Sequence, residues 1–174
     1  AAWQRDLAQT LAWLNRPAEA RVLLAQALAV QQRLPAHEAE RLRSELLQVE
    51  IELAQGQLAR ATTGLDRIDT HLPRATFPAL HQAAWALRGR LAMHDSNPAE
   101  AERWLGRAWR EALAWRGGPH PSLMPIGIEL MAVLRAEHRP EQEALLLPDL
   151  QRSLRGQDEA SPWRARLLAL TAAK

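Results

Sequence analysis

The feature of this sequence that most constrains its fold is a short polar turn that recurs about every 41 residues. The recurring segments are residues 15–20, 56–61, 96–101 and 138–144. Each turn lies between two stretches in which apolar residues recur every three or four positions, which is the period of an α-helix. One such hairpin cannot bury its own apolar face, so the period indicates a stacked array of helix pairs.

Nine helices are predicted between the helix breakers. They are expected at about 1–14, 17–33, 36–54, 58–72, 77–93, 98–115, 121–137, 140–154 and 162–172. The clearest start is at residues 97–100, where Asn97 can cap the helix and Pro98 suits the first helical position. Pro148 lies inside the eighth segment, where it removes one hydrogen bond and should kink or split the helix.

The core of the array is predicted from stripes that recur after the turns. Each stripe has a small residue, which lets the helices of a hairpin approach closely, followed by two more inward positions. The three stripes are Ala20, Leu24 and Ala27; Ala61, Leu65 and Ile68; and Ala101, Leu105 and Ala108. Leu42, Leu46, Val49 and Leu53 form a further apolar stripe, as do Ile126, Leu130 and Leu134.

The composition agrees with an all-α domain and excludes other classes. Of 174 residues, 47% are hydrophobic and 24% charged, which excludes a disordered tail, and no apolar stretch approaches membrane-spanning length. Val and Ile are scarce beside Ala, Leu and Arg, so strands have little to form from. The chain has no cysteine, and its pI near 10.2 reflects arginine at a net charge of only +2.

No motif in the sequence indicates catalysis. The six histidines form no HExxH pair, and no GxxxxGK[ST] or GxSxG segment is present. The sequence therefore predicts a protein that is not an enzyme and has no catalytic residue, no cofactor site and no metal site.

The first repeat resembles a tetratricopeptide repeat in the spacing of Leu7, Ala8 and Leu11, in its turn at Asn15 and in the stripe that follows the turn. Trp85, Leu87 and Leu91 give the third repeat a similar pattern. The period is longer than the family's usual 34 residues and is closer to the extended repeats of the kinesin-light-chain type in bacterial signalling proteins. The sequence departs from the family in that only one turn keeps a glycine and the register of the third and fourth repeats slips by one residue.

The resemblance implies a right-handed α-solenoid of antiparallel helix pairs that forms a single domain over residues 1–174. Its repeats are expected at about 1–34, 35–74, 75–117 and 118–156, with a terminal helix at 162–172. Because the chain starts without Met, we expect it to be part of a larger protein. The resemblance further implies a cytoplasmic, non-catalytic protein–protein interaction scaffold that serves as the regulatory module of a bacterial protein in signal transduction.

In such an array a peptide or partner protein binds in a concave groove formed by the first helix of each pair. The side chains expected in this groove are Arg5, Gln9, Trp13, Arg43, Glu50, Trp85, Arg90 and Arg135. They supply one arginine per repeat, and because arginine can grip a carboxylate with two hydrogen bonds, the partner is expected to be acidic or carboxylate-terminated.

Two other functions stay open. Helical repeats also bind RNA, but Asp and Glu are interspersed with Arg in nearly every predicted helix, so no basic stripe is evident. The chain could also be an oligomerisation unit that self-associates through Leu167, Leu168 and Leu170 of its terminal helix.

The seven tryptophans are an unusual feature of this sequence. We expect part of the set, with Trp104 and Trp115 in the sixth segment, to pack in the core.

Overall fold

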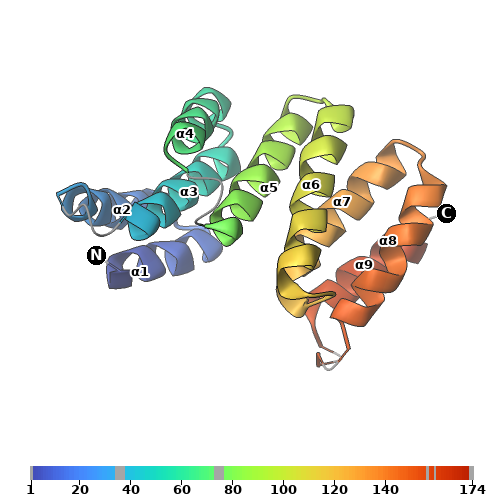
Figure 1. Ribbon diagram of the computed structural model, residues 1–174. Helices are drawn as coiled ribbons and strands as arrows, with labels where there is room; N and C mark the ends of the chain where they lie inside the picture. The colour runs from blue at the N-terminus through green and yellow to red at the C-terminus, as the bar shows by residue number, and fades with distance from the viewer. Residues whose placement is uncertain (1, 34–37, 73–76, 156, 159, 173–174) are drawn as a thin grey trace. The chain divides into compact units, whose positions relative to one another are not determined.

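A computed structural model describes residues 2–33, 38–72, 77–155, 157–158 and 160–172, and within this part of the chain every regular element is helical (Figure 1). The elements are α1 (Ala2–Trp13), α2 (Pro17–Gln31), α3 (Glu38–Ala54), α4 (Leu58–His71), α5 (Pro78–His94), α6 (Pro98–Arg116), the short 3-10 helix η2 (Pro121–Leu123), α7 (Met124–Ala136), α8 (Pro140–Ser153) and α9 (Pro162–Ala172). The predicted all-α class and the nine predicted helical segments are confirmed for these residues, with ends displaced by at most three residues.

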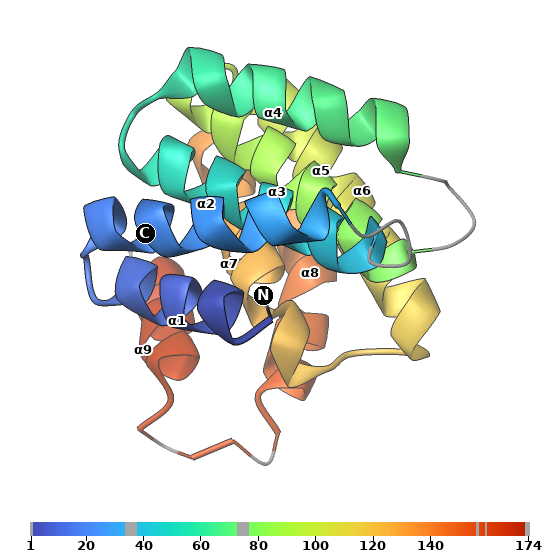
Figure 2. The same cartoon turned by 90° about the vertical axis from the view of Figure 1, so that its left-hand side faces the viewer.

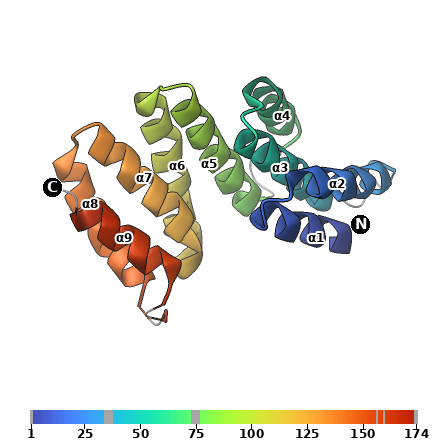
Figure 3. The same cartoon turned by 180° about the vertical axis from the view of Figure 1, so that it is seen from behind.

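The chain divides inside α5 into two compact units, Ala1–Leu87 and Arg88–Lys174. In the first unit, α1 and α2 form an antiparallel pair that packs against α3, and α3 pairs with α4 (Figure 2). In the second unit, α7 contacts α6, α8 and α9, and α9 lies beside α7 and α8 (Figure 3). Each unit is thus built from helices that pack against their neighbours in the sequence.

The four predicted turns share one backbone geometry. One residue at each turn has a left-handed conformation: Asn15 (φ 56°), Gly56 (φ 68°), Ser96 (φ 55°) and His138 (φ 53°). The residue after it donates its N–H to a carbonyl five positions earlier, as from Arg16 to Leu11 at 2.8 Å. This bond defines a Schellman motif, which ends a helix by satisfying its last carbonyls. The period of the sequence is therefore a period of backbone geometry.

The expected register slip is not found at the third and fourth turns. Ser96 and His138 are the first residues of their segments, as Asn15 and Gly56 are, and in all four turns the next helix begins two residues after the left-handed one. Asn97, the second residue of its segment, caps α6, because its Oδ1 accepts a hydrogen bond from the backbone N–H of Glu100 at 3.2 Å. The predicted cap is confirmed.

The predicted core stripes are buried, except that Ile126 is half-buried against the core of the second unit. The nine residues that follow the first three turns are at most 1% exposed. In the first unit, Leu47 and Ile51 of α3 pack against Ala8 and Leu24 of the first hairpin. In the second unit, α6, α7 and α8 enclose a larger cluster that includes Trp109, Met131 and Leu150. Burial of these faces supplies the main driving force for stacking the helices.

Two sequence expectations require correction. Pro148 does not split the eighth segment, because α8 runs unbroken from Pro140 to Ser153. The bond that Pro148 cannot make would go to the carbonyl of Ala144, and both residues are exposed, so water can replace it. The expected core packing of tryptophans is also wrong for Trp115, which is 52% exposed, whereas Trp109 is 5% exposed.

None of the described helices combines the length and the apolar character that a membrane crossing requires.

Candidate functional site

The first predicted site residues lie where α1 meets α3. Nη1 of Arg5 and Nη1 of Arg43 both donate to the carboxylate of Glu40, one to each oxygen. Arg5 also binds Oδ1 of Asp6, through Nη2 at 2.8 Å and Nε at 3.1 Å. The structure therefore brings Arg5 and Arg43, from the first helices of two successive pairs, to one carboxylate.

The charges around Glu40 affect its protonation. Burial acts to raise the pKa of Glu40, but the hydrogen bonds and charges of Arg5 and Arg43 outweigh burial and leave the pKa below its usual value. Burial likewise acts to lower the pKa of Arg5, but the hydrogen bonds that Arg5 donates to Asp6 and Glu40 raise it overall. Glu40 and Arg5 are therefore both charged at neutral pH.

The other predicted residues of the first unit differ in exposure. Gln9 and Trp13 follow Arg5 at intervals of four residues and so lie along the same side of α1. Gln9 is half-buried, as is Glu50 of α3, whereas Trp13 is 75% exposed. Trp85 is half-buried and stacks on His81, with ring centroids 5.4 Å apart. Of these four side chains, Trp13 is thus the most accessible to a partner.

In the second unit, the predicted arginines also pair with carboxylates of this chain. Nε of Arg90 lies 2.9 and 3.0 Å from the two carboxylate oxygens of Glu129, which joins α5 to α7. Nε of Arg135 lies 3.5 Å from Oε2 of Glu143, which joins α7 to α8. Each of the four predicted arginines therefore has an acidic partner within the protein.

Sequence reasoning missed these acidic partners. Glu40 carried a local signal, because it lies three residues before Arg43 and so on the same face of α3. Glu129 carried no such signal, since it lies 39 residues from Arg90 and reaches it only through the packing of two helices.

The α6 helix carries a second group of aromatic and charged residues. The ring of Trp104 lies under two guanidinium groups, at 4.6 Å from Arg103 and 5.6 Å from Arg88. Its Nε1 donates to Glu100 at 2.6 Å. The hydrogen bond from Arg103 lowers the pKa of Glu100; burial acts to raise it, and the hydrogen bond from Trp104 adds to the lowering. Trp104 is therefore fixed in place by its neighbours.

Hollows occur within both units of the described chain. One of 430 Å³ lies between α3 and α4, one of 280 Å³ between α6, α7 and α8, and one of 330 Å³ between α8 and α9. None of the three is lined by a predicted groove residue. The surface formed by α1 and α3 and these hollows are accordingly separate places at which a ligand could bind.

One further surface is apolar and exposed. Trp3 and Leu7 of α1 are 64% and 42% exposed, and Leu14, which directly follows α1 and donates its N–H to the carbonyl of Thr10, is 63% exposed. Their spacing of four and seven residues places them within roughly 40° around the helix axis. This apolar stripe lies on a different side of α1 from Arg5 and Gln9.

Among the described residues, no group of three or more His, Asp or Glu side chains is placed to hold a metal ion.

Comparison with protein-family models, with curated proteins and with solved structures finds no match to this chain. The functional argument therefore depends on the surfaces described above.

Proposed function

We propose that this chain is a non-catalytic protein-interaction module, the regulatory part of a larger bacterial protein, which binds a partner on the surface that α1 and α3 share. The observation that carries the proposal is the pairing of Arg5 and Arg43 with Glu40. This pairing fixes side chains of two successive first helices next to each other. An extended surface of this kind is how helical repeats hold a peptide or a partner helix.

The chemistry of this surface favours a partner with carboxylates. Arg43 is half exposed, and its one described side-chain hydrogen bond, through Nη1, goes to Glu40. A guanidinium has five N–H donors, so Arg43 keeps donors for a second carboxylate. Trp13, which is 75% exposed, offers a large apolar contact on the neighbouring helix. Aromatic and arginine side chains are the residue types that most often dominate binding energy at interfaces.

The experiment compares partner capture by three forms of the chain. Wild type, Arg43→Glu and Arg60→Glu are immobilised, and recovered proteins are quantified by mass spectrometry. Arg60 is the matched control because it is an exposed arginine on α4, the second helix of the same pair. Partners that bind through Arg43 are expected to fall at least tenfold with Arg43→Glu, since a like charge then faces their carboxylates, and to stay unchanged with Arg60→Glu. Equal recovery from all three forms would contradict the proposal.

A second candidate function is self-association, and the apolar stripe on α1 favours it. Monomeric proteins seldom expose contiguous large apolar side chains without a partner that covers them. The terminal helix proposed for this role from the sequence is less suited, because Leu167 is buried and Leu170 is half-buried against the core of its own unit. Leu168 is 63% exposed and lines the hollow between α8 and α9 instead.

A further inference from the structure

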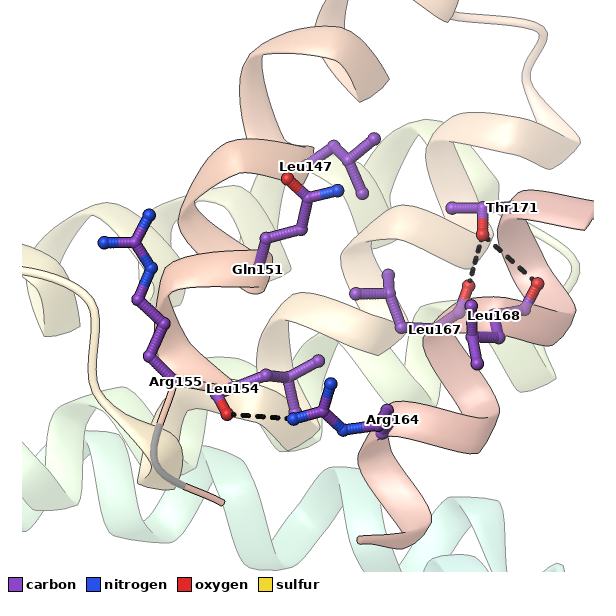
Figure 4. Close-up of a pocket in the computed structure, with 8 residues that line it drawn as sticks. All are labelled: Leu147, Gln151, Leu154, Arg155, Arg164, Leu167, Leu168 and Thr171. Atoms are coloured by element: carbon purple, nitrogen blue, oxygen red, sulfur yellow. Dashed lines mark hydrogen bonds between the residues drawn. The ribbon is translucent and has the colours of Figure 1, made fainter. Parts of the chain in front are cut away.

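The hollow between α8 and α9 has apolar walls. It has a volume of 330 Å³, near the lower limit for small-molecule sites, which begin at roughly 300 Å³. Leu147 comes from α8, Leu154 directly follows α8, and Leu167 and Leu168 come from α9 (Figure 4). Leu168 is 63% exposed, so the hollow opens to solvent beside it. These four leucines can enclose an aliphatic chain.

One end of the hollow is positively charged. Nη2 of Arg164, on α9, lies 3.5 Å from the carbonyl oxygen of Leu154, directly after α8 (Figure 4), and 3.4 Å from that of Gln157 in the connection between the two helices. Both distances are long for hydrogen bonds from a charged donor. The Nε of Arg164 is buried and has no hydrogen-bond partner among the described residues. The guanidinium is therefore incompletely satisfied.

Nothing acidic offsets this charge within the hollow. Arg155 is the second charged lining residue, and no Asp or Glu lines the hollow. Neither Arg155 nor Arg164 forms an ion pair with a described carboxylate, unlike the arginines on α1, α3 and α7. An anionic group is the ligand that complements such a site.

The remaining polar side chains leave little capacity for a peptide backbone. The hydroxyl of Thr171 donates to the carbonyl oxygens of Leu167 and Leu168, at 3.0 and 3.2 Å. The amide of Gln151 is then the main group left to bind an N–H or a carbonyl. A ligand with one anionic group and an otherwise apolar body fits better than a peptide, whose unpaired amides would be costly to bury.

From these contacts we infer that the hollow between α8 and α9 binds a small aliphatic monocarboxylate, with the carboxylate at Arg164 and the chain along the four leucines. This site uses no residue of the surface on α1 and α3, so it stands or falls separately from the proposed function.

The probe is octanoate, titrated into the full chain labelled with ¹⁵N and followed by NMR. The backbone amides of Leu167, Leu168 and Thr171 are expected to shift, with a dissociation constant on the order of millimolar for a ligand this small. Octan-1-ol and octylammonium have the same chain with a neutral or a positive head group. Both are expected to bind at least tenfold more weakly, because only the carboxylate complements Arg164.

Two variants test the residues. Arg164→Gln removes the charge, and we expect it to weaken octanoate binding about tenfold, which corresponds to a lost charge-assisted hydrogen bond. Because Arg164 also contacts the end of α8, Leu168→Asp provides a second variant at an exposed position and places a negative charge at the mouth of the hollow. Its matched control is Leu145→Asp, at a leucine of α8 that is 79% exposed and does not line this hollow.

The inference is supported if Leu168→Asp abolishes octanoate binding while Leu145→Asp binds as wild type does. It is overturned if octan-1-ol binds as tightly as octanoate, if the shifts centre on other helices, or if no shift occurs at 10 times the expected constant, roughly 10 mM. Tighter binding of a short peptide that ends in leucine would overturn it in favour of a peptide terminus.

Discussion

Arg5 of α1 and Arg43 of α3 donate hydrogen bonds to opposite oxygens of a single carboxylate, that of Glu40. The two guanidinium groups carry like charges, and the carboxylate between them offsets their repulsion. The contact therefore links the first two helix pairs by electrostatics, in addition to the apolar packing of Ala8 and Leu11 against Leu47 and Ile51.

Replacement of Glu40 by glutamine is expected to destabilise the protein in a pH-dependent manner. Because the pKa of Glu40 is lower in the folded state than in the unfolded chain, its contribution is full above about pH 4.3 and is lost as the pH falls through the folded value. At pH 7 we expect Glu40→Gln to lower the free energy of unfolding by about 0.5–1 kcal/mol, as for partly exposed ion pairs.

Urea unfolding of wild type and Glu40→Gln at pH 7 and at pH 2.5 measures this difference. It should shrink at the lower pH, because protonation of the wild-type carboxyl removes its charge. An equal loss at both values would show that Glu40 acts through packing and not through its charge.

The left-handed residue at the fourth turn offers a stabilising substitution. His138 has φ 53°, a conformation that costs a residue with a Cβ roughly 1–2 kcal/mol and glycine almost nothing. Part of the gain is offset by the greater freedom of glycine in the unfolded chain. We expect His138→Gly to raise the free energy of unfolding by about 0.5–1 kcal/mol.

The matched control is Ala136→Gly, two positions earlier at the end of α7. The backbone at this position is helical and not left-handed, so glycine should destabilise the protein by up to about 1 kcal/mol. In denaturant unfolding, the free energy of unfolding should rise for His138→Gly and fall for Ala136→Gly. A change of the same sign in both variants would contradict the left-handed geometry of the turn.

Gly127 of α7 is expected to tolerate no side chain. A Cβ at this position would lie 2.7 Å from Cζ3 of Trp109 and would also contact Cδ2 of Leu150. Both neighbours are at most 5% exposed, so neither can move into solvent. Gly127→Ala should therefore lower the free energy of unfolding by about 1–3 kcal/mol.

Gly106→Ala is the control for this prediction. Its Cβ would meet only the flexible end of Arg110 at 3.3 Å, and the gain in helix propensity should offset that contact. Thermal unfolding of the two variants should separate them, and equal midpoints would contradict the close packing.

The helices and turns could be predicted because their signals are local. Pro17, Pro98 and Pro140 each open a helix at its first position, and the small and apolar residues after each turn repeat the same spacing. Trp109 carried a local signal as well, since it lies four residues after Leu105 and three before Ala112, both buried. It was missed because the spacing of Trp104 and Trp115 was considered in its place.

The site could not be predicted to the same degree, because it depends on contacts between helices far apart in the sequence. The reach of Arg5 to Glu40 spans 35 residues and follows only from the way α1 packs on α3. The hollow between α8 and α9 likewise depends on how two separate helices leave space between their side chains.

The apolar stripe on α1 leads to a prediction about assembly. If Trp3, Leu7 and Leu14 are covered by a second copy of the chain, the wild-type sedimentation coefficient should rise with protein concentration. A charge at the centre of such a contact would be buried without a partner, which is costly. Trp3→Glu is therefore expected to remain monomeric at every concentration.

Trp13→Glu serves as the control for this experiment. Trp13 lies on the same helix and is more exposed than Trp3, at 75% against 64%. It lies roughly 80° away around the helix axis, on the side of Arg5 and Gln9. Trp13→Glu alone should still associate as wild type does, because it leaves the apolar stripe intact. A wild-type sedimentation coefficient that is independent of concentration would exclude self-association through α1 and leave the apolar stripe available to a different protein.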